Sequence, residues 1–170
     1  MSTAIPPRPR QVGTKHQGFE SSRHRRRFVI VASQFNAQYV QGLIDHATAE
    51  LRELAPSAVT TLHQVPGAFE IPIVAREVAV QQKPDAILAL GVILQGKTKH
   101  AENLGWSVTD ALQRIALEHG VPVINAVLVL DSETQARERC LEEEINRGTE
   151  AARAAIQVAD VLSDLREQQS

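Results

Sequence analysis

A hydroxyl group, two lysines and a histidine stand close together in the segment Gly96-Lys97-Thr98-Lys99-His100. The segment follows an apolar run, 86–94, that is typical of a strand buried on both faces, and it leads into a stretch with helical spacing. The start of a helix offers unpaired N–H groups and a partial positive charge to an anion. The same positive end disfavours a protonated imidazole, which suits His100 to accept and return protons near neutral pH. The segment therefore predicts an anion site with acid/base chemistry, although a structural histidine fits the local pattern equally well.

A second segment has the same design. Val65-Pro66-Gly67-Ala68-Phe69-Glu70-Ile71-Pro72 also carries a strand-like run through a glycine turn into a helix. In open α/β sheets, ligands bind beyond the carboxyl ends of the strands, which is where both segments are expected to lie. The chain has no Gly-x-Gly-x-x-Gly after its first strand, no Gly-x-Ser-x-Gly and no His-Glu-x-x-His. Dinucleotide, serine-hydrolase and zinc-protease chemistry therefore have no support.

The composition is that of one ordinary globular domain. The chain has 170 residues, of which 43% are hydrophobic and 22% are charged. A single cysteine, Cys140, excludes an intrachain disulfide and a cysteine-based zinc site. No apolar run approaches the roughly 20 residues of a membrane helix, and the N-terminus lacks the apolar stretch of a secretory signal. We therefore expect a cytoplasmic protein without membrane contact.

Residues 1–27 are expected to form a basic arm ahead of a single domain over residues 28–170. The arm holds seven of the 18 Lys and Arg residues and only one of the 20 acids, whereas the domain has a net charge of −8. The arm contains three prolines and few apolar residues, so it cannot build a core and is expected to be flexible and solvated. The alternatives are nucleic-acid contact, docking on an acidic surface of the same protein, and a transit peptide; of these, we do not expect nucleic acid to be a partner.

The rest of the chain alternates apolar strands with helices. Strands are predicted at 28–32, 58–65, 86–94 and 121–130, and helical spacing follows each of them. Asn36 and Ser132 are predicted to cap helices, and Gly148 is predicted to break the helical C-terminal part. The order β-α-β-α-β-α-β-α-α predicts a three-layer α/β/α sandwich around a four-stranded parallel sheet, of the flavodoxin-like type.

Several segments together resemble one enzyme family. Val65–Pro72, Gly91–His100 and Asn146–Ala152 look like motifs of the lumazine synthases, and Phe35-Asn36 matches that family's Phe-Asn. The resemblance implies a condensation that needs no cofactor. In this reaction, 5-amino-6-(D-ribitylamino)uracil and 3,4-dihydroxy-2-butanone 4-phosphate give 6,7-dimethyl-8-ribityllumazine, the penultimate step of riboflavin biosynthesis.

The resemblance also implies the roles of the site residues. His100 matches the general acid/base, and Phe35 matches the aromatic ring that stacks on the pyrimidine. Glu70 matches the contact to the ribityl chain, and Thr98 and Arg139 match the phosphate ligands, with Arg139 supplied by the neighbouring subunit. The remaining positions that match substrate contacts, or stand beside them, are Ala68, Phe69, Ile93, Leu94, Lys97, Asn125 and Arg147.

The chain departs from the family pattern at several of these positions. Asn125 stands where the family usually places an aromatic residue, Arg147 replaces a usual lysine, and Lys97 replaces a small residue. Ala101 and Asn103 replace aromatic residues that usually follow the histidine. These changes bear on substrate affinity more than on reaction type. They keep two alternatives open, namely a shell or scaffold protein of the same fold with impaired catalysis, and a flavin- or pterin-binding module.

The resemblance finally implies an assembly. Members of this family form homopentamers, and some pack twelve pentamers into a hollow icosahedral shell of 60 subunits. In the family, an inserted loop in the stretch that corresponds to Arg139–Gly148 is associated with free pentamers, and this chain has no such insertion. The resemblance therefore favours the 60-subunit shell.

Overall fold

The computed structural model describes residues 25–96 and 99–168. Strands and helices alternate along the chain. They are β1 (Arg27–Ser33), α1 (Ala37–Leu54), β2 (Val59–Val65), the 3-10 turn η1 (Ala68–Glu70), α2 (Ile71–Gln81), β3 (Ala86–Leu94), α3 (His100–His119), β4 (Val123–Leu130), α4 (Glu133–Cys140) and α5 (Arg147–Glu167). The predicted succession of elements is confirmed.

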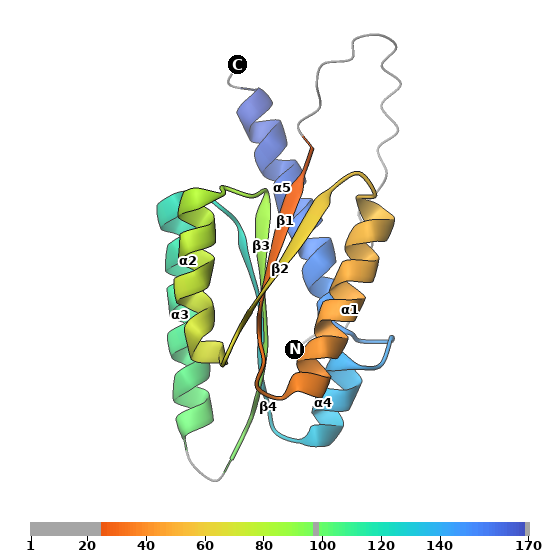
Figure 1. The fold of residues 1–170 in the computed structure, drawn as a ribbon, viewed down its shortest axis with the longest axis vertical. Coiled ribbons are helices and arrows are strands. Elements are labelled where there is room, and N and C mark those ends of the chain that lie inside the picture. Colours follow the sequence, from red (N-terminus) through yellow and green to blue (C-terminus); the bar gives the residue numbers. More distant parts are fainter. Residues whose placement is uncertain (1–24, 97–98, 169–170) are drawn as a thin grey trace.

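The four strands form one parallel sheet in the order β2-β1-β3-β4. Helices α2 and α3 cover one face of the sheet, and α1, α4 and α5 lie on the other (Figure 1). The predicted three-layer sandwich is therefore confirmed, and the strand order is that of the first four strands of a flavodoxin-like sheet. Because all strands run the same way, their carboxyl ends meet at one end of the sheet, the lower end in Figure 1.

Strand β3 divides the hydrophobic core into two halves. Leu88 and Leu90 pack on the side of α1 and α5, whereas Ile87 and Ala89 pack on the side of α2 and α3. All four side chains are fully buried. A central parallel strand is covered on both faces, which explains why the run 86–94 is apolar almost throughout.

The C-terminal helices differ from the sequence prediction. Gly148 does not break a helix, because α4 already ends at Cys140 and Gly148 lies in the first turn of α5. Asn146 caps α5, since its Oδ1 accepts hydrogen bonds from the backbone N–H groups of Gly148 at 2.9 Å and Thr149 at 3.3 Å. A Cβ atom on Gly148 would overlap the carbonyl oxygen of Leu43 and stand 3.0 Å from the Leu43 Cα. The glycine is thus required by the close approach of α1 and α5.

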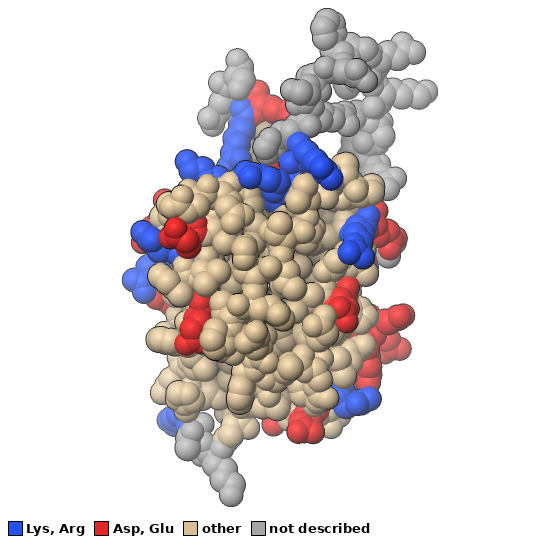
Figure 2. Space-filling model, viewed as in Figure 1, with Lys and Arg blue, Asp and Glu red and all other residues tan. Residues whose placement is uncertain are grey.

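The residues that lead into β1 are attached to the domain. The Arg25 side chain donates to the Ser57 carbonyl at 2.7 Å, and the Arg26 side chain pairs with the Asp160 carboxylate at 2.6 Å. The backbone N–H of Arg27 donates to the Asp85 carboxylate at 2.7 Å. Figure 2 shows Lys and Arg side chains gathered at this end of the molecule. The rest of the predicted arm, residues 1–24, lies outside the described residues.

We expect Gly148→Ala to destabilise the fold. In an open helix position, alanine would be favoured over glycine by about 1 kcal/mol. At Gly148 the clash with the Leu43 backbone opposes this preference, and the overpacking is expected to lower the free energy of unfolding by about 1–3 kcal/mol. Urea unfolding monitored by circular dichroism measures the difference. Gly96→Ala is the control, because a Cβ there meets nothing within 4 Å; equal stability of the two variants would contradict the packing argument.

Candidate functional site

The loop after β1 places an aromatic ring at the carboxyl end of the sheet. The backbone N–H of Gln34 donates to the carbonyl of Val65 at 2.8 Å, and that of Phe35 donates to the carbonyl of Pro66 at 3.2 Å. These bonds tie the β1 loop to the turn that follows β2. The Phe35 side chain is nevertheless 70% exposed. An exposed ring on a fixed backbone offers its face to a planar ligand.

The turn after β2 presents a second exposed ring. In η1, the Ala68 side chain is buried, and Ile71, which follows directly, is fully buried. These two anchors leave Phe69 between them 65% exposed and Glu70 half-buried. The carboxyl ends of β1 and β2 thus bring the segment of Phe35 beside the segment that carries Ala68, Phe69 and Glu70.

The end of β3 lies beside this turn. Ile93 is 8% exposed and Leu94 is half-buried. The carbonyl of Val92 accepts a hydrogen bond from the side-chain Nδ2 of Asn36 at 2.8 Å, so Asn36 links the loop of Phe35 to β3. The prediction that the Asn36 side chain caps α1 is therefore wrong. Asn36 occupies the N-cap position but makes no side-chain cap hydrogen bond.

His100 is the first residue of α3, and its side chain is exposed. The helix begins just beyond the carboxyl end of β3, at the end of the sheet that also carries Phe35 (Figure 1). A histidine at this place can reach a ligand held beyond the strands. The two predicted anion contacts Lys97 and Thr98 lie outside the described residues.

The spacing of Gly91, Gly96, Lys97 and Thr98 also fits a P-loop, Gly-x-x-x-x-Gly-Lys-Thr. In a P-loop, the residues between the two glycines form a loop whose backbone N–H groups surround the phosphates. Here Gly91–Leu94 belong to β3 and pair with β4 over their whole length. This part of the segment is a strand, so the pattern does not have P-loop geometry.

The two predicted arginines lie elsewhere, in a groove of about 590 Å³ along the edge strand β4. Arg139 from α4 and Arg147 from α5 both line this groove. Arg147 is paired with Glu150, three residues further along α5. Arg139 differs, because its Nη1 is buried and has no hydrogen-bond partner among the described residues. A buried guanidinium nitrogen without an acceptor is costly, and an anion would satisfy it.

Asn125 lines the same groove but is bonded toward the opposite face of the sheet. Its Nδ2 donates to the Thr109 hydroxyl of α3 at 3.0 Å, and its Oδ1 accepts from the backbone N–H of Val127 at 3.0 Å. The sequence did not point to Thr109, because the two residues are 16 positions apart on different elements. Glu150 as the partner of Arg147 could have been found from its i+3 spacing on a helix.

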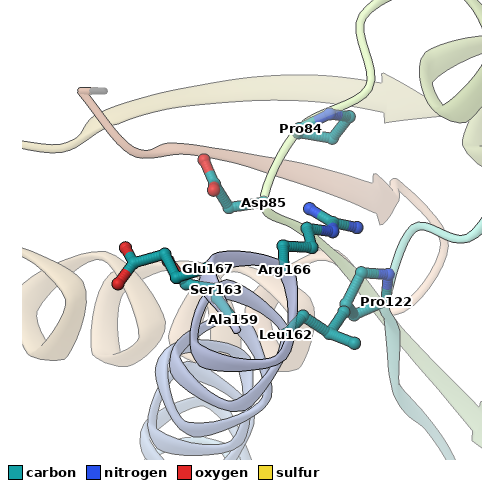
Figure 3. Close-up of a pocket in the computed structure, with 8 residues that line it drawn as sticks. All are labelled: Pro84, Asp85, Pro122, Ala159, Leu162, Ser163, Arg166 and Glu167. Atoms are coloured by element: carbon teal, nitrogen blue, oxygen red, sulfur yellow. The ribbon is translucent and has the colours of Figure 1, made fainter. Parts of the chain in front are cut away.

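Other features of the described residues offer no catalytic alternative. Burial raises the pKa of the Cys140 thiol to about 12, so it remains protonated and unreactive in the fold. No cluster of three or more His, Cys, Asp or Glu side chains within residues 25–96 and 99–168 could hold a metal ion. None of the helices described there is long and apolar enough to cross a membrane. A pocket of about 250 Å³ lies at the amino ends of the strands, lined by α5 and by the turns before β3 and β4 (Figure 3).

Two similarities in sequence place the chain in a known family. The sequence pattern of the family described as 6,7-dimethyl-8-ribityllumazine synthase matches residues 25–163. The 6,7-dimethyl-8-ribityllumazine synthase of Leptothrix cholodnii is 39% identical over 140 residues, which are 82% of this chain and 88% of that protein. Among solved structures, a de novo designed Rossmann-fold protein is similar with a TM-score of 0.39 and 17% identity, over 66% of this chain and 91% of that one. From the family match and the relative, the chain belongs to the 6,7-dimethyl-8-ribityllumazine synthase family.

Proposed function

We propose that this chain condenses 5-amino-6-(D-ribitylamino)uracil with 3,4-dihydroxy-2-butanone 4-phosphate to 6,7-dimethyl-8-ribityllumazine, the penultimate step of riboflavin biosynthesis. The family match over residues 25–163 carries this conclusion. The arrangement at the carboxyl ends of β1, β2 and β3 supports it, because two exposed aromatic rings and a histidine lie at one end of the sheet. The direct test is turnover of both substrates, followed by the absorbance of the lumazine.

The chemistry needs an aromatic platform, a proton carrier and an anion site. The primary amine of the pyrimidine attacks the ketone, and loss of water gives an imine. Elimination then releases inorganic phosphate, and closure of the second ring releases another water. Phe35 holds the pyrimidine by stacking, and His100 moves protons between these steps. Holding two substrates together supplies a large part of the acceleration without any group from a cofactor.

The anion site is proposed to come from a neighbouring subunit. Arg139 and Arg147 line a groove formed by β4, α4 and α5, whereas Phe35, Phe69 and His100 stand on the loops and helix starts beyond β1, β2 and β3. A second copy of the chain that docks its β4 edge beside these loops would bring the unpaired Arg139 nitrogen to the phosphate. The site is then complete only between two subunits.

The surface formed by α2 and α3 is a second feature that supports assembly. Phe69 is 65% exposed and Ile73 is 63% exposed, and both line an apolar groove of about 410 Å³ between the two helices. Large exposed apolar side chains that lie close together mark interaction surfaces. A homopentamer, with twelve pentamers in a 60-subunit shell, is the assembly that we propose.

A scaffold protein of the same fold with impaired catalysis is the second candidate. Asn125 favours it, because an amide bonded to Thr109 and to the Val127 backbone replaces a stacking ring at the groove. Assembly without lumazine formation would identify such a scaffold.

We expect His100→Ala to lower kcat by about 10²–10⁴-fold, because general acid/base catalysis contributes this much. Some activity should remain, since binding both substrates together still accelerates the reaction. Steady-state kinetics measure the change. His46→Ala is the control, because His46 lies on α1 and its Nε2 lies 3.2 Å from the Leu141 carbonyl, on the other face of the sheet. A His100 variant with the kcat of the wild type would remove this residue from the mechanism.

Arg139→Ala should raise KM for the butanone phosphate about tenfold to hundredfold, which is the effect of losing a charge-assisted hydrogen bond. KM for the pyrimidine should change little. Arg137→Ala is the matched control, since it removes an exposed arginine from the same helix. Equal effects on both substrates would refute the assignment of Arg139 to the phosphate.

The same variant tests the shared site. Mixed oligomers of Arg139→Ala and His100→Ala subunits should regain activity, because some interfaces then combine two intact halves. Absence of recovery in oligomers that mass spectrometry shows to be mixed would mean that each site is built within one chain.

The assembly and the role of the arm are tested by sedimentation velocity over a range of salt concentrations. We expect a species near 60 subunits at low salt. Deletion of residues 1–24 leaves the contacts of Arg25–Arg27 in place, and it should weaken the shell if the basic arm joins acidic neighbours. A five-subunit species at high protein concentration would contradict the shell, and unchanged assembly of the deletion variant would contradict the role of the arm.

A further inference from the structure

Asn36 adopts a backbone conformation that side chains rarely take. Its φ of 57° and ψ of 45° lie in the left-handed region. Only one other non-glycine residue among those described, Lys83, has a positive φ. The conformation directs the Asn36 side chain away from its own helix, where it forms no cap, and onto the Val92 carbonyl at 2.8 Å. A strained residue held by a contact 56 positions away points to a requirement at the site.

The Val92 carbonyl needs this partner because β1 is shorter than β3 at the carboxyl end. Pairing between β1 and β3 stops at Ala32 and Leu90. Pairing between β3 and β4 continues to Leu94 and Leu130. Beyond Leu90, β3 therefore has a strand on one side only. The Asn36 amide occupies the next position on the other side and supplies the donor that a longer β1 would have given.

The N–H and C=O groups of successive β3 residues point alternately to the two sides of the strand. This alternation identifies the groups that follow the Val92 carbonyl on the side away from β4. The N–H of Gln95 points to β4, since it donates to the Leu130 carbonyl at 2.8 Å. Neighbouring residues of a strand direct their peptide groups to opposite sides. The N–H and C=O of Leu94 consequently point to the side of Asn36 and Phe35, one step beyond the Val92 carbonyl that Asn36 satisfies.

We propose that Asn36 is a positioning residue for the pyrimidine substrate, which rests on the proposed function of the chain. Its side-chain amide donates the last hydrogen bond on this side of β3, to the Val92 carbonyl, and so joins the loop of Phe35 to the end of β3. The ring of Phe35 and the peptide groups of Leu94 are thereby held in one fixed relation. A planar pyrimidine stacked on the ring presents its donors and acceptors at its edge, where the Leu94 groups stand. Asn36 itself does not touch the reacting atoms.

Asn36→Gly separates the hydrogen bond from the backbone conformation. Glycine adopts a positive φ without strain, so the turn is kept and only the contact to Val92 is lost. KM for the pyrimidine should rise about fivefold to twentyfold, as expected for one lost hydrogen bond, while KM for the butanone phosphate stays within about twofold. Lys83→Gly is the control, because it relieves the other positive φ at an exposed position in the turn before β3 and should leave both KM values unchanged.

Asn36→Asp separates positioning from stability. Aspartate has nearly the shape of asparagine and tolerates the same φ, but its carboxylate repels the Val92 carbonyl. At the same time it adds an acid at the start of α1, whose first turn has none, and this favours the helix. Pyrimidine binding, measured by calorimetry with the pyrimidine alone, should be weaker than in Asn36→Gly, while the midpoint of urea unfolding does not fall.

The outcomes separate the two proposals. Wild-type protein that forms no lumazine contradicts the proposed function. Wild-type turnover with an unchanged pyrimidine KM in Asn36→Gly contradicts the role of Asn36 alone. A pyrimidine affinity that follows unfolding stability across the two variants would mean that Asn36 is merely structural, and would also overturn the inference.

Discussion

The burial of β3 on both faces is the constraint from which the rest of the structure follows. A strand with Leu88 and Leu90 on one side and Ile87 and Ala89 on the other must be covered by helices on both faces. Such cover requires parallel strands joined by crossover helices, and parallel strands bring all their carboxyl ends to one end of the sheet. Two segments far apart in the chain, the β1 loop and the turn after β2, therefore meet where β3 ends. The site is a consequence of how the core is covered.

Strand and helix positions were predictable because they depend on periodicity, which is local. The apolar run 86–94 appears in the structure as β3 with the same ends. Gly148 was misjudged, because the sequence suggests only a weak helix former, whereas the structure uses the missing side chain to let α5 approach Leu43. A close approach of two backbones involves residues a hundred positions apart and leaves no local pattern.

The residue types of the site were also visible in the sequence, but their distribution in space was not. Nothing in the spacing of Arg139 and His100 indicates that the first lines the β4 groove and the second starts the helix after β3. The position of the Asn36 side chain could not be predicted from the sequence either. A polar residue before a helix usually caps it, and only the left-handed backbone and the early end of β1 redirect this side chain to Val92.

The two arginines of the β4 groove differ in a way that, in the proposed shared site, would link ligand binding to assembly. Arg147 has its own counterion in Glu150, whereas the Nη1 of Arg139 is buried with no acceptor among the residues that the structure describes. In the proposed site shared between two copies, an anion bound at Arg139 would also contact the second subunit, so the ligand would bind the assembled form more tightly than the separated one. By linkage, any ligand with this preference stabilises the assembly by the same free energy. The phosphate of the substrate would then hold the subunits together while it is bound, and its release as product would loosen the contact.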